Sequence, residues 1–355
     1  ISFYTFQTLS YTIDVYKRKL EPTKDLIAFS AFVSFFPQLV AGPIERATHL
    51  LPQFYTKRTF DYSKAVDGMR QILWGLFKKI VIADNCGKYA NLIFNNSSDY
   101  SGSTLVLGAL FFTFQIYGDF SGYSDIAIGT SRLFGFDLMR NFAFPYFSRD
   151  IAEFWRRWHI SLSTWFRDYL YIPLGGSRGG TWMKVRNTFI IFIVSGFWHG
   201  ANWTFIIWGA LNAIYLLPLL LTKNNRKNLG IVAQGKHFPS IQELSFMLVT
   251  FGLIVFAWIF FRAENINHAI SYISEIFSYS LFTEPEFPKK RESLNTIILV
   301  IGFIIIEWLG REQQYAIVNL GRKWNRPLRY AIYYLMIIAI IMSSGQEQRF
   351  IYFQF

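Results

Sequence analysis

Charged residues are scarce in this sequence, and cysteine is almost absent. Charged side chains make up 16% of the 355 residues, whereas an average soluble domain carries about 25%. This scarcity excludes a disordered chain and argues against an ordinary cytosolic enzyme. Cys86 has no second cysteine to pair with, which excludes an internal disulfide and a secreted disulfide scaffold.

Several common catalytic and binding motifs are also missing. We find no glycine-rich phosphate loop, no zinc-ligand spacing and no serine nucleophile elbow, and we predict no metal site. The chain does not begin with a recognisable signal peptide, because Ile1 already lies in an apolar stretch that continues to Ile13. We therefore expect a fragment whose N-terminal part is missing.

What the sequence does contain is long apolar runs. Hydrophobic residues make up 52% and aromatic residues 19% of the chain. Windows without Asp, Glu, Lys or Arg cover residues 26–44, 100–118, 187–222, 244–261, 293–306 and 330–346. A membrane-spanning helix needs about 20 apolar residues, so the pattern predicts an all-α, multi-span membrane protein. Window 187–222 is too long for one span, and we expect two helical pieces, or one long tilted helix with a break at Ser195–Gly200.

The net charge of +12 comes from basic clusters between these windows. They cover residues 17–24, 140–186, 223–236 and 311–329. We expect them to face the cytoplasm and anionic membrane lipid, not nucleic acid, which places the tail after Ser343 on the outside. Segment 44–99 is also basic and breaks the alternation, so we expect a re-entrant or interfacial helix over 65–94.

Segment Arg149–Tyr171 has an aromatic face. Its apolar residues fall at i, i+3, i+4 and i+7 spacings: Trp155, Trp158, Leu162, Trp165, Phe166 and Tyr169. This periodicity predicts one amphipathic helix, and its Trp and Arg content is typical of the membrane–water boundary.

Two histidines are candidates for chemistry. His199 lies in the long apolar window, where an ionisable residue is a functional hypothesis by default, and a neutral imidazole can accept a hydroxyl proton. The alternative is a histidine that only packs in the structure, with its imidazole hydrogen-bonded to a neighbouring carbonyl. His159, forty residues earlier, lies on the aromatic helix, where it is either functional or simply solvated. We predict that His49, His237 and His268 are solvated.

Asp119 and Asp125 need partners or water at membrane depth. A buried ion pair or helix cap is the favoured interpretation, ahead of catalysis. The candidate partners are Arg132, Arg149, Arg156 and Arg157. Glu307 and Arg311 are expected to pair at i, i+4.

The sequence ends in the aromatic tail Phe350–Phe355. An interfacial anchor is one interpretation. Insertion of Tyr352, which carries the only hydroxyl of the tail, into a pocket is the other.

Taken together, these motifs resemble the membrane-bound O-acyltransferase superfamily, in particular the bacterial branch similar to the alginate O-acetylation membrane protein. The matching segments are 1–7, 40–44, 115–129, 156–163, 167–176, 196–203 and the aromatic tail. The resemblance implies a polytopic transmembrane helical bundle, with interfacial or re-entrant helices around an intramembrane funnel. It implies one O-acyltransferase domain over 1–355, without its N-terminal spans.

The resemblance also implies roles for particular residues. His199 matches the catalytic histidine, and His159 matches the second signature position, which eukaryotic members fill with Asn or Asp. Support of the funnel is expected from Asp119, Asp125, Trp158, Trp198 and Asn202. Asn212 departs from the pattern, because many relatives have His there.

The implied reaction is O-acetylation of an extracytoplasmic polysaccharide such as alginate, at the bacterial cytoplasmic membrane. The donor is expected to be acetyl-CoA or another acyl thioester, with no tightly bound cofactor. A dry intramembrane path keeps water from the acyl group. By analogy with D-alanylation, Tyr352 would pass the acyl group to an extracytoplasmic partner of the GDSL/SGNH esterase-like type. The alternatives are D-alanyl transfer to a cell-wall polymer, and a transporter or scaffold of a glycan-export complex.

Overall fold

The computed structural model describes residues 3–287, 289–321, 324–345, 348 and 350–351, and the regular secondary structure in this part is helical. The α-helices are α1 (Phe3–Tyr16), α2 (Leu26–Val33), α3 (Ala47–Tyr55), α4 (Tyr62–Leu76), α5 (Asp84–Asn95), α6 (Gly102–Leu133), α7 (Ile151–Arg157), α8 (Ile160–Phe166), α9 (Gly180–His199), α10 (Trp203–Leu221), α11 (Ile241–Arg262), α12 (Ile266–Ile276), α13 (Lys290–Gly310) and α14 (Arg326–Ser343). The predicted all-α class is confirmed.

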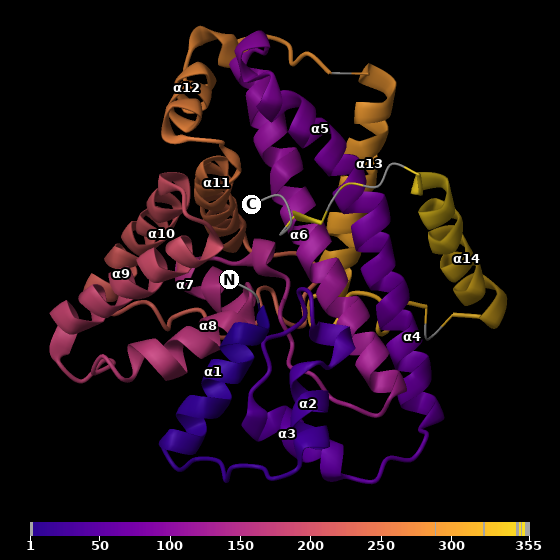
Figure 1. The fold of residues 1–355 in the computed structure, drawn as a ribbon. Coiled ribbons are helices and arrows are strands. Elements are labelled where there is room, and N and C mark those ends of the chain that lie inside the picture. The colour runs from indigo at the N-terminus through magenta and orange to yellow at the C-terminus, as the bar shows by residue number, and fades with distance from the viewer. Residues whose placement is uncertain (1–2, 288, 322–323, 346–347, 349, 352–355) are drawn as a thin grey trace.

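Five helices of the described part are long and apolar enough to cross a membrane: α6, α10, α11, α13 and α14. Each overlaps one of the predicted windows. Window 26–44 does not contain such a helix. Helix α2 ends at Val33, and only a short 3₁₀ turn, Phe36–Gln38, follows before the chain turns at Gly42. Figure 1 shows α14 at the edge of the bundle, on the side away from α9 and α10.

Helix α6 forms the centre of the bundle, and most of its apolar window is buried. Helix α4, a π-helical segment (Phe77–Ala83) and α5 run continuously beside it. Glycines allow this approach, because a Cβ on Gly68 would lie 2.6 Å from Gly129 O and a Cβ on Gly75 2.6 Å from Gly122 O. Small residues let helices in membranes pack backbone to backbone.

Two buried ion pairs explain why α6 continues past the predicted window. Lys78 Nζ lies 2.6 Å from Asp125 Oδ2, and Lys79 Nζ lies 2.8 Å from Asp119 Oδ1. The predicted pairing of both carboxylates is confirmed, but the expected arginine partners are wrong. The π-helical segment brings two successive lysines of the neighbouring helix to α6, which sequence separation alone did not reveal.

The predicted pairing of Glu307 with Arg311 is also wrong. Glu307 accepts a hydrogen bond from Tyr117 Oη at 2.5 Å. The Arg311 guanidinium instead donates to the carbonyl groups of Val232 and Ala233. Partners from other elements therefore replace the local i, i+4 contact.

The long window 187–222 forms two helical pieces in a hairpin, as predicted. The break lies at Gly200–Asn202 and not across Ser195–Gly200, because α9 continues to His199. Gly196 and Gly209 bring α9 and α10 together, since a Cβ on either would lie within 2.3 Å of a carbonyl oxygen of the other helix. Asn202 begins α10 by accepting a hydrogen bond from Thr204 N through its side chain.

Segment 149–171 is not one helix. Helix α7 ends at Arg157, and α8 begins at Ile160, because His159 adopts a left-handed backbone conformation with φ of 42°. The irregular segment before α7 stabilises this break: Ala143 N donates to Arg157 O, and Ile160 N donates to Asn141 O, both at 2.9 Å. A single-helix prediction could not include these long-range backbone bonds.

Candidate active site

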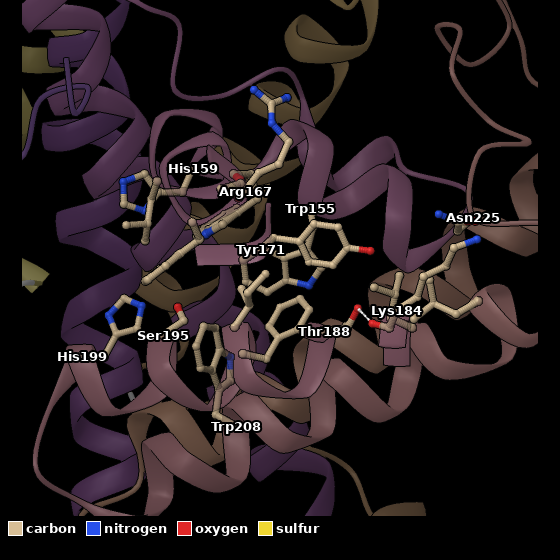
Figure 2. A pocket seen from close by; sticks show the side chains of 18 of the residues that line it. Trp155, His159, Arg167, Tyr171, Lys184, Thr188, Ser195, His199, Trp208 and Asn225 are labelled. Atoms are coloured by element: carbon tan, nitrogen blue, oxygen red, sulfur yellow. Dashed lines mark hydrogen bonds between the residues drawn. The ribbon is translucent and has the colours of Figure 1, made fainter. Parts of the chain in front are cut away.

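A cavity of about 580 Å³ lies among α7, α8, α9, α10 and α11 (Figure 2). Its apolar wall consists mainly of aromatic and branched side chains: Ile116, Trp155, Trp158, Leu162, Phe166, Ile191, Phe192, Trp208, Leu216, Leu220, Trp258 and Phe261. A predominantly apolar cavity with a few polar groups is the usual form of a small-molecule site.

His199 ends α9 and lines this cavity. Its ring is partly exposed, and it packs against Phe261 and Trp208 with ring centroids 5.0 and 5.2 Å away. Gly200 follows in an extended conformation and ends the helix directly after the histidine. The hairpin therefore holds the imidazole at the tip of two tightly packed helices, facing the cavity.

His159 lines the same cavity from the break between α7 and α8. It is 2% exposed, and its ring lies edge to face against Phe120 at 4.6 Å. Trp198 contacts both histidines, with ring centroids 6.4 Å from His159 and 4.7 Å from His199. In Figure 2 the two histidines lie at one end of the cavity.

The other end of the cavity is polar and basic. Lys184, Lys223 and Arg226 contribute cations there, together with the amide of Asn225. Figure 2 shows Lys184 and Asn225 far across the cavity from His199. Because Lys184 precedes His199 by fifteen residues on α9, the rise of a helix separates them by about 22 Å along the axis. The cavity therefore joins a cationic rim to a pair of histidines.

Sequence reasoning missed most of the cavity wall, although a signal was present. Lys184, Thr188, Ile191, Ser195 and His199 follow one another at intervals of three or four residues, and all five line the cavity. These intervals place them on one face of α9. Tracing that face back from His199 would have found the wall from the sequence.

Asn212, the departure from the expected pattern, is fully buried beside this wall. Its Oδ1 accepts a hydrogen bond from Trp155 Nε1 at 3.2 Å, and its Nδ2 donates to Trp208 O at 2.8 Å. Both tryptophans line the cavity. Asn212 thus fixes the position of Trp155 in the wall.

The predicted supporting residues occupy different places. Trp158 lies in the cavity wall. The Trp198 ring packs against the rings of both His159 and His199. Asn202 caps α10, and its Nδ2 also donates to Glu264 O. Asp119 and Asp125 lie on α6 in their lysine pairs and do not line the cavity. Tyr352 lies outside the described residues.

The other three histidines lie away from the cavity. His237 is exposed, as predicted. His49 is hydrogen-bonded to buried Glu45 at 2.7 Å, which raises the pKa of the imidazole above its usual value. His268 is half-buried beside Ser97, and burial lowers its pKa. For these two, simple solvation was the wrong description, because each folds against a neighbour.

Comparisons with a family model and with known proteins agree with one another. The sequence model of MBOAT, the membrane-bound O-acyltransferase family, matches residues 16–261. A probable alginate O-acetylase of Pseudomonas putida is 39% identical over 100% of this chain and 74% of its own length. A peptidoglycan O-acetyltransferase of Helicobacter pylori is 39% identical over 76% of this chain and 55% of its own. A teichoic acid D-alanyltransferase of Bacillus subtilis is 27% identical over 76% of this chain and 69% of its own. The chain thus spans between about half and three quarters of the length of these relatives.

Proposed function

Because the chain belongs to the membrane-bound O-acyltransferase family, we propose that it moves an acetyl group from a cytosolic thioester donor for O-acetylation of an extracytoplasmic polysaccharide. The observation that carries this proposal is the meeting of His199 and His159 on one apolar cavity. The protein is an integral membrane protein, and we place it in the bacterial cytoplasmic membrane.

His199 acts as the general base. Its partly exposed imidazole accepts the proton of a hydroxyl that enters the cavity, and the hydroxyl oxygen attacks the thioester carbonyl carbon. The carbon–sulfur bond breaks, an oxygen ester forms, and the thiolate takes up the proton. His159 orients the donor or stabilises the oxyanion at the same end of the cavity. The aromatic wall excludes water, which would otherwise hydrolyse the acyl group.

The basic rim binds the donor. Acetyl-CoA carries phosphate groups at the far end of a long thiol arm, and Lys184, Lys223 and Arg226 supply cations for such phosphates. The distance of about 22 Å along α9 from Lys184 to His199 gives the arm a path to the histidines. Another phosphate-bearing acyl thioester satisfies the same geometry.

We propose Tyr352 as the acyl shuttle. It would accept the acetyl group under His199 and pass it to a serine of an extracytoplasmic partner of the GDSL/SGNH esterase-like type, which modifies the glycan. Support comes from Ile351, the preceding residue, which is buried in the bundle at 1% exposure. Relatives named for alginate O-acetylation are 39–43% identical to this chain, and one named for peptidoglycan O-acetylation is 39% identical. We therefore propose a polysaccharide acceptor without choosing between the two.

The alternatives receive less support. The relative named for D-alanyl transfer shares 27% of aligned residues, against 39% for those named for O-acetylation. A transporter with a proton path through Asp119 and Asp125 would need carboxylates that exchange protons, yet both are held in ion pairs with lysines. These pairs favour a fixed structural role.

The test compares polysaccharide O-acetyl esters in cells that carry the full-length protein, its His199→Ala variant or its His237→Ala variant, at matched membrane levels. We expect acetyl ester to disappear with His199→Ala and to persist with His237→Ala, because His237 is exposed and does not line the cavity. Persistent acetylation in the His199→Ala cells would reject His199 as the base and favour the transporter or scaffold.

A further inference from the structure

The last described residues of the chain lie inside the helical bundle. Helix α14 ends at Ser343 on the edge of the molecule, yet Ile351, eight residues later, is 1% exposed. The Phe350 ring lies 5.6 Å from the ring of Tyr123 on α6. The segment therefore returns from the edge to the centre of the bundle.

Three polar side chains hold the backbone and side chain of this segment. Asp119 Oδ2 accepts a hydrogen bond from Ile351 N at 2.6 Å. Lys79 Nζ donates to Gln348 O at 3.2 Å, and Asn91 Nδ2 donates to Gln348 Oε1 at 3.1 Å. These three side chains come from α6, the π-helical segment and α5, so the segment joins separate elements of the bundle.

The charges around Asp119 favour a hydrogen bond from a backbone amide. Asp119 is 1% exposed, and Lys79 neutralises it while also lying 2.7 Å from Asp84. One carboxylate oxygen of Asp119 faces Lys79, and the other accepts a hydrogen bond from the backbone amide of Ile351. A hydrogen bond to a carboxylate is roughly twice as strong as one between neutral groups.

A second pair on the same helix offers a comparison. Asp125 is matched with Lys78 in the same manner, and its second partner is the side chain of Gln71. Both aspartates neutralise a lysine of the same neighbouring segment. Asp119 is the one that also accepts a hydrogen bond from the backbone of the C-terminal segment, so its role exceeds that of a buried ion pair.

The contact between Asp119 and Ile351 lies beside the histidine end of the cavity. Ile116, one helical turn before Asp119, lines the cavity. Phe120, the next residue, packs on His159 with ring centroids 4.6 Å apart. A segment anchored at Asp119 is thus separated from the cavity wall by about one turn of α6.

We propose that Asp119, Lys79 and Asn91 form a docking site for the C-terminal segment, and that this site positions the tail for acyl transfer at the histidines. The positioning role rests on the proposed function of Tyr352, which follows Ile351 in the sequence. The docking of the segment at Asp119 does not depend on that proposed function. Asp119 and Lys79 are positioning residues, because they act through the tail and not on the donor.

Hydrogen exchange tests docking without any assay of activity. The full-length protein and its Asp119→Asn and Asp125→Asn variants are compared by exchange of the Ile351 backbone amide. Asp119→Asn loses a charge-assisted bond, so exchange accelerates by about tenfold or more. Asp125→Asn removes the other lysine-paired charge of α6 without touching the segment and keeps exchange slow. Unchanged exchange in Asp119→Asn, or equal acceleration in both variants, would overturn the docking site.

A second variant avoids any disturbance of α6. Ile351→Pro removes the donating amide and leaves Asp119 and Lys79 in place, and Ile351→Val, which keeps the amide, is its reference. We expect Ile351→Pro to lower the turnover of glycan acetylation about tenfold relative to Ile351→Val, with the KM for acetyl-CoA unchanged. Equal turnover in the two variants would overturn the positioning role. Absence of acetylation in the unmodified protein, with slow exchange at Ile351, would overturn the proposed function and leave docking intact.

Discussion

At the scale of single residues, the account depends on two histidines with unequal surroundings. His199 is partly exposed to the cavity, whereas His159 is 2% exposed and enclosed by Phe120 and Trp198. The His199 side chain, which lines the cavity, suits proton transfer with a substrate hydroxyl. The enclosed ring suits a fixed hydrogen bond or charge interaction in the transition state.

This difference leads to a prediction for His159. Replacement by Leu should lower kcat by about 10² to 10³, as the removal of one oxyanion donor does elsewhere, and leave the KM for the donor within about twofold. Replacement by Asn keeps a donor and should restore part of the loss. Steady-state kinetics of the purified protein measure both constants. A large rise in KM with unchanged kcat would place His159 in donor binding instead.

At the scale of elements, close glycine contacts hold the helices together. A Cβ on Gly122 would lie 2.8 Å from Gly75 O, but a Cβ on Gly302 would meet nothing within 4 Å. We therefore expect Gly122→Ala to lower the unfolding temperature in detergent. Gly302→Ala should leave it unchanged or raise it, because Ala is favoured over Gly in a helix by up to about 1 kcal/mol. Equal effects of the two substitutions would show that glycine packing does not set the distance between α4 and α6.

The rim at the end of α10 gives a second prediction for an element. Lys223 lines the cavity, and Lys227, in the same connector, is exposed and does not. Lys223→Gln should raise the KM for acetyl-CoA by about tenfold, because a charge-assisted bond to phosphate is lost. Lys227→Gln is the matched control for the loss of one positive charge. Initial rates at varied donor concentration measure the effect, and equal KM values for the two variants would remove the rim from donor binding.

Sequence patterns predicted elements better than their ends and partners. The hairpin of α9 and α10 followed from window length, and the spans α11, α13 and α14 followed from charge-free runs. The break at His159 did not, because backbone bonds to Asn141 and Ala143 stabilise it from outside the segment. The lysine partners of Asp119 and Asp125 were missed for a similar reason, since they come from a π-helical segment that composition does not reveal.

At the scale of the whole molecule, the bundle brings distant parts of the chain to one place. His159 and His199 come from two different helical units, and Ile351 approaches from the C-terminal end to bind α6 near Phe120. The resemblance of motifs indicated the two histidines as a pair. The path from the basic rim to the histidines emerged only from the packing of α7 to α11.

The central claim is that His199 carries out acyl transfer in this cavity. The most direct measurement is the rate at which purified full-length protein releases free thiol from acetyl-CoA in the presence of its acceptor, compared with the His199→Ala variant. Loss of a general base lowers such a rate by about 10² to 10⁴, so we predict a decrease in this range with the fold intact by thermal unfolding. An unchanged rate in the folded His199→Ala protein would contradict the account.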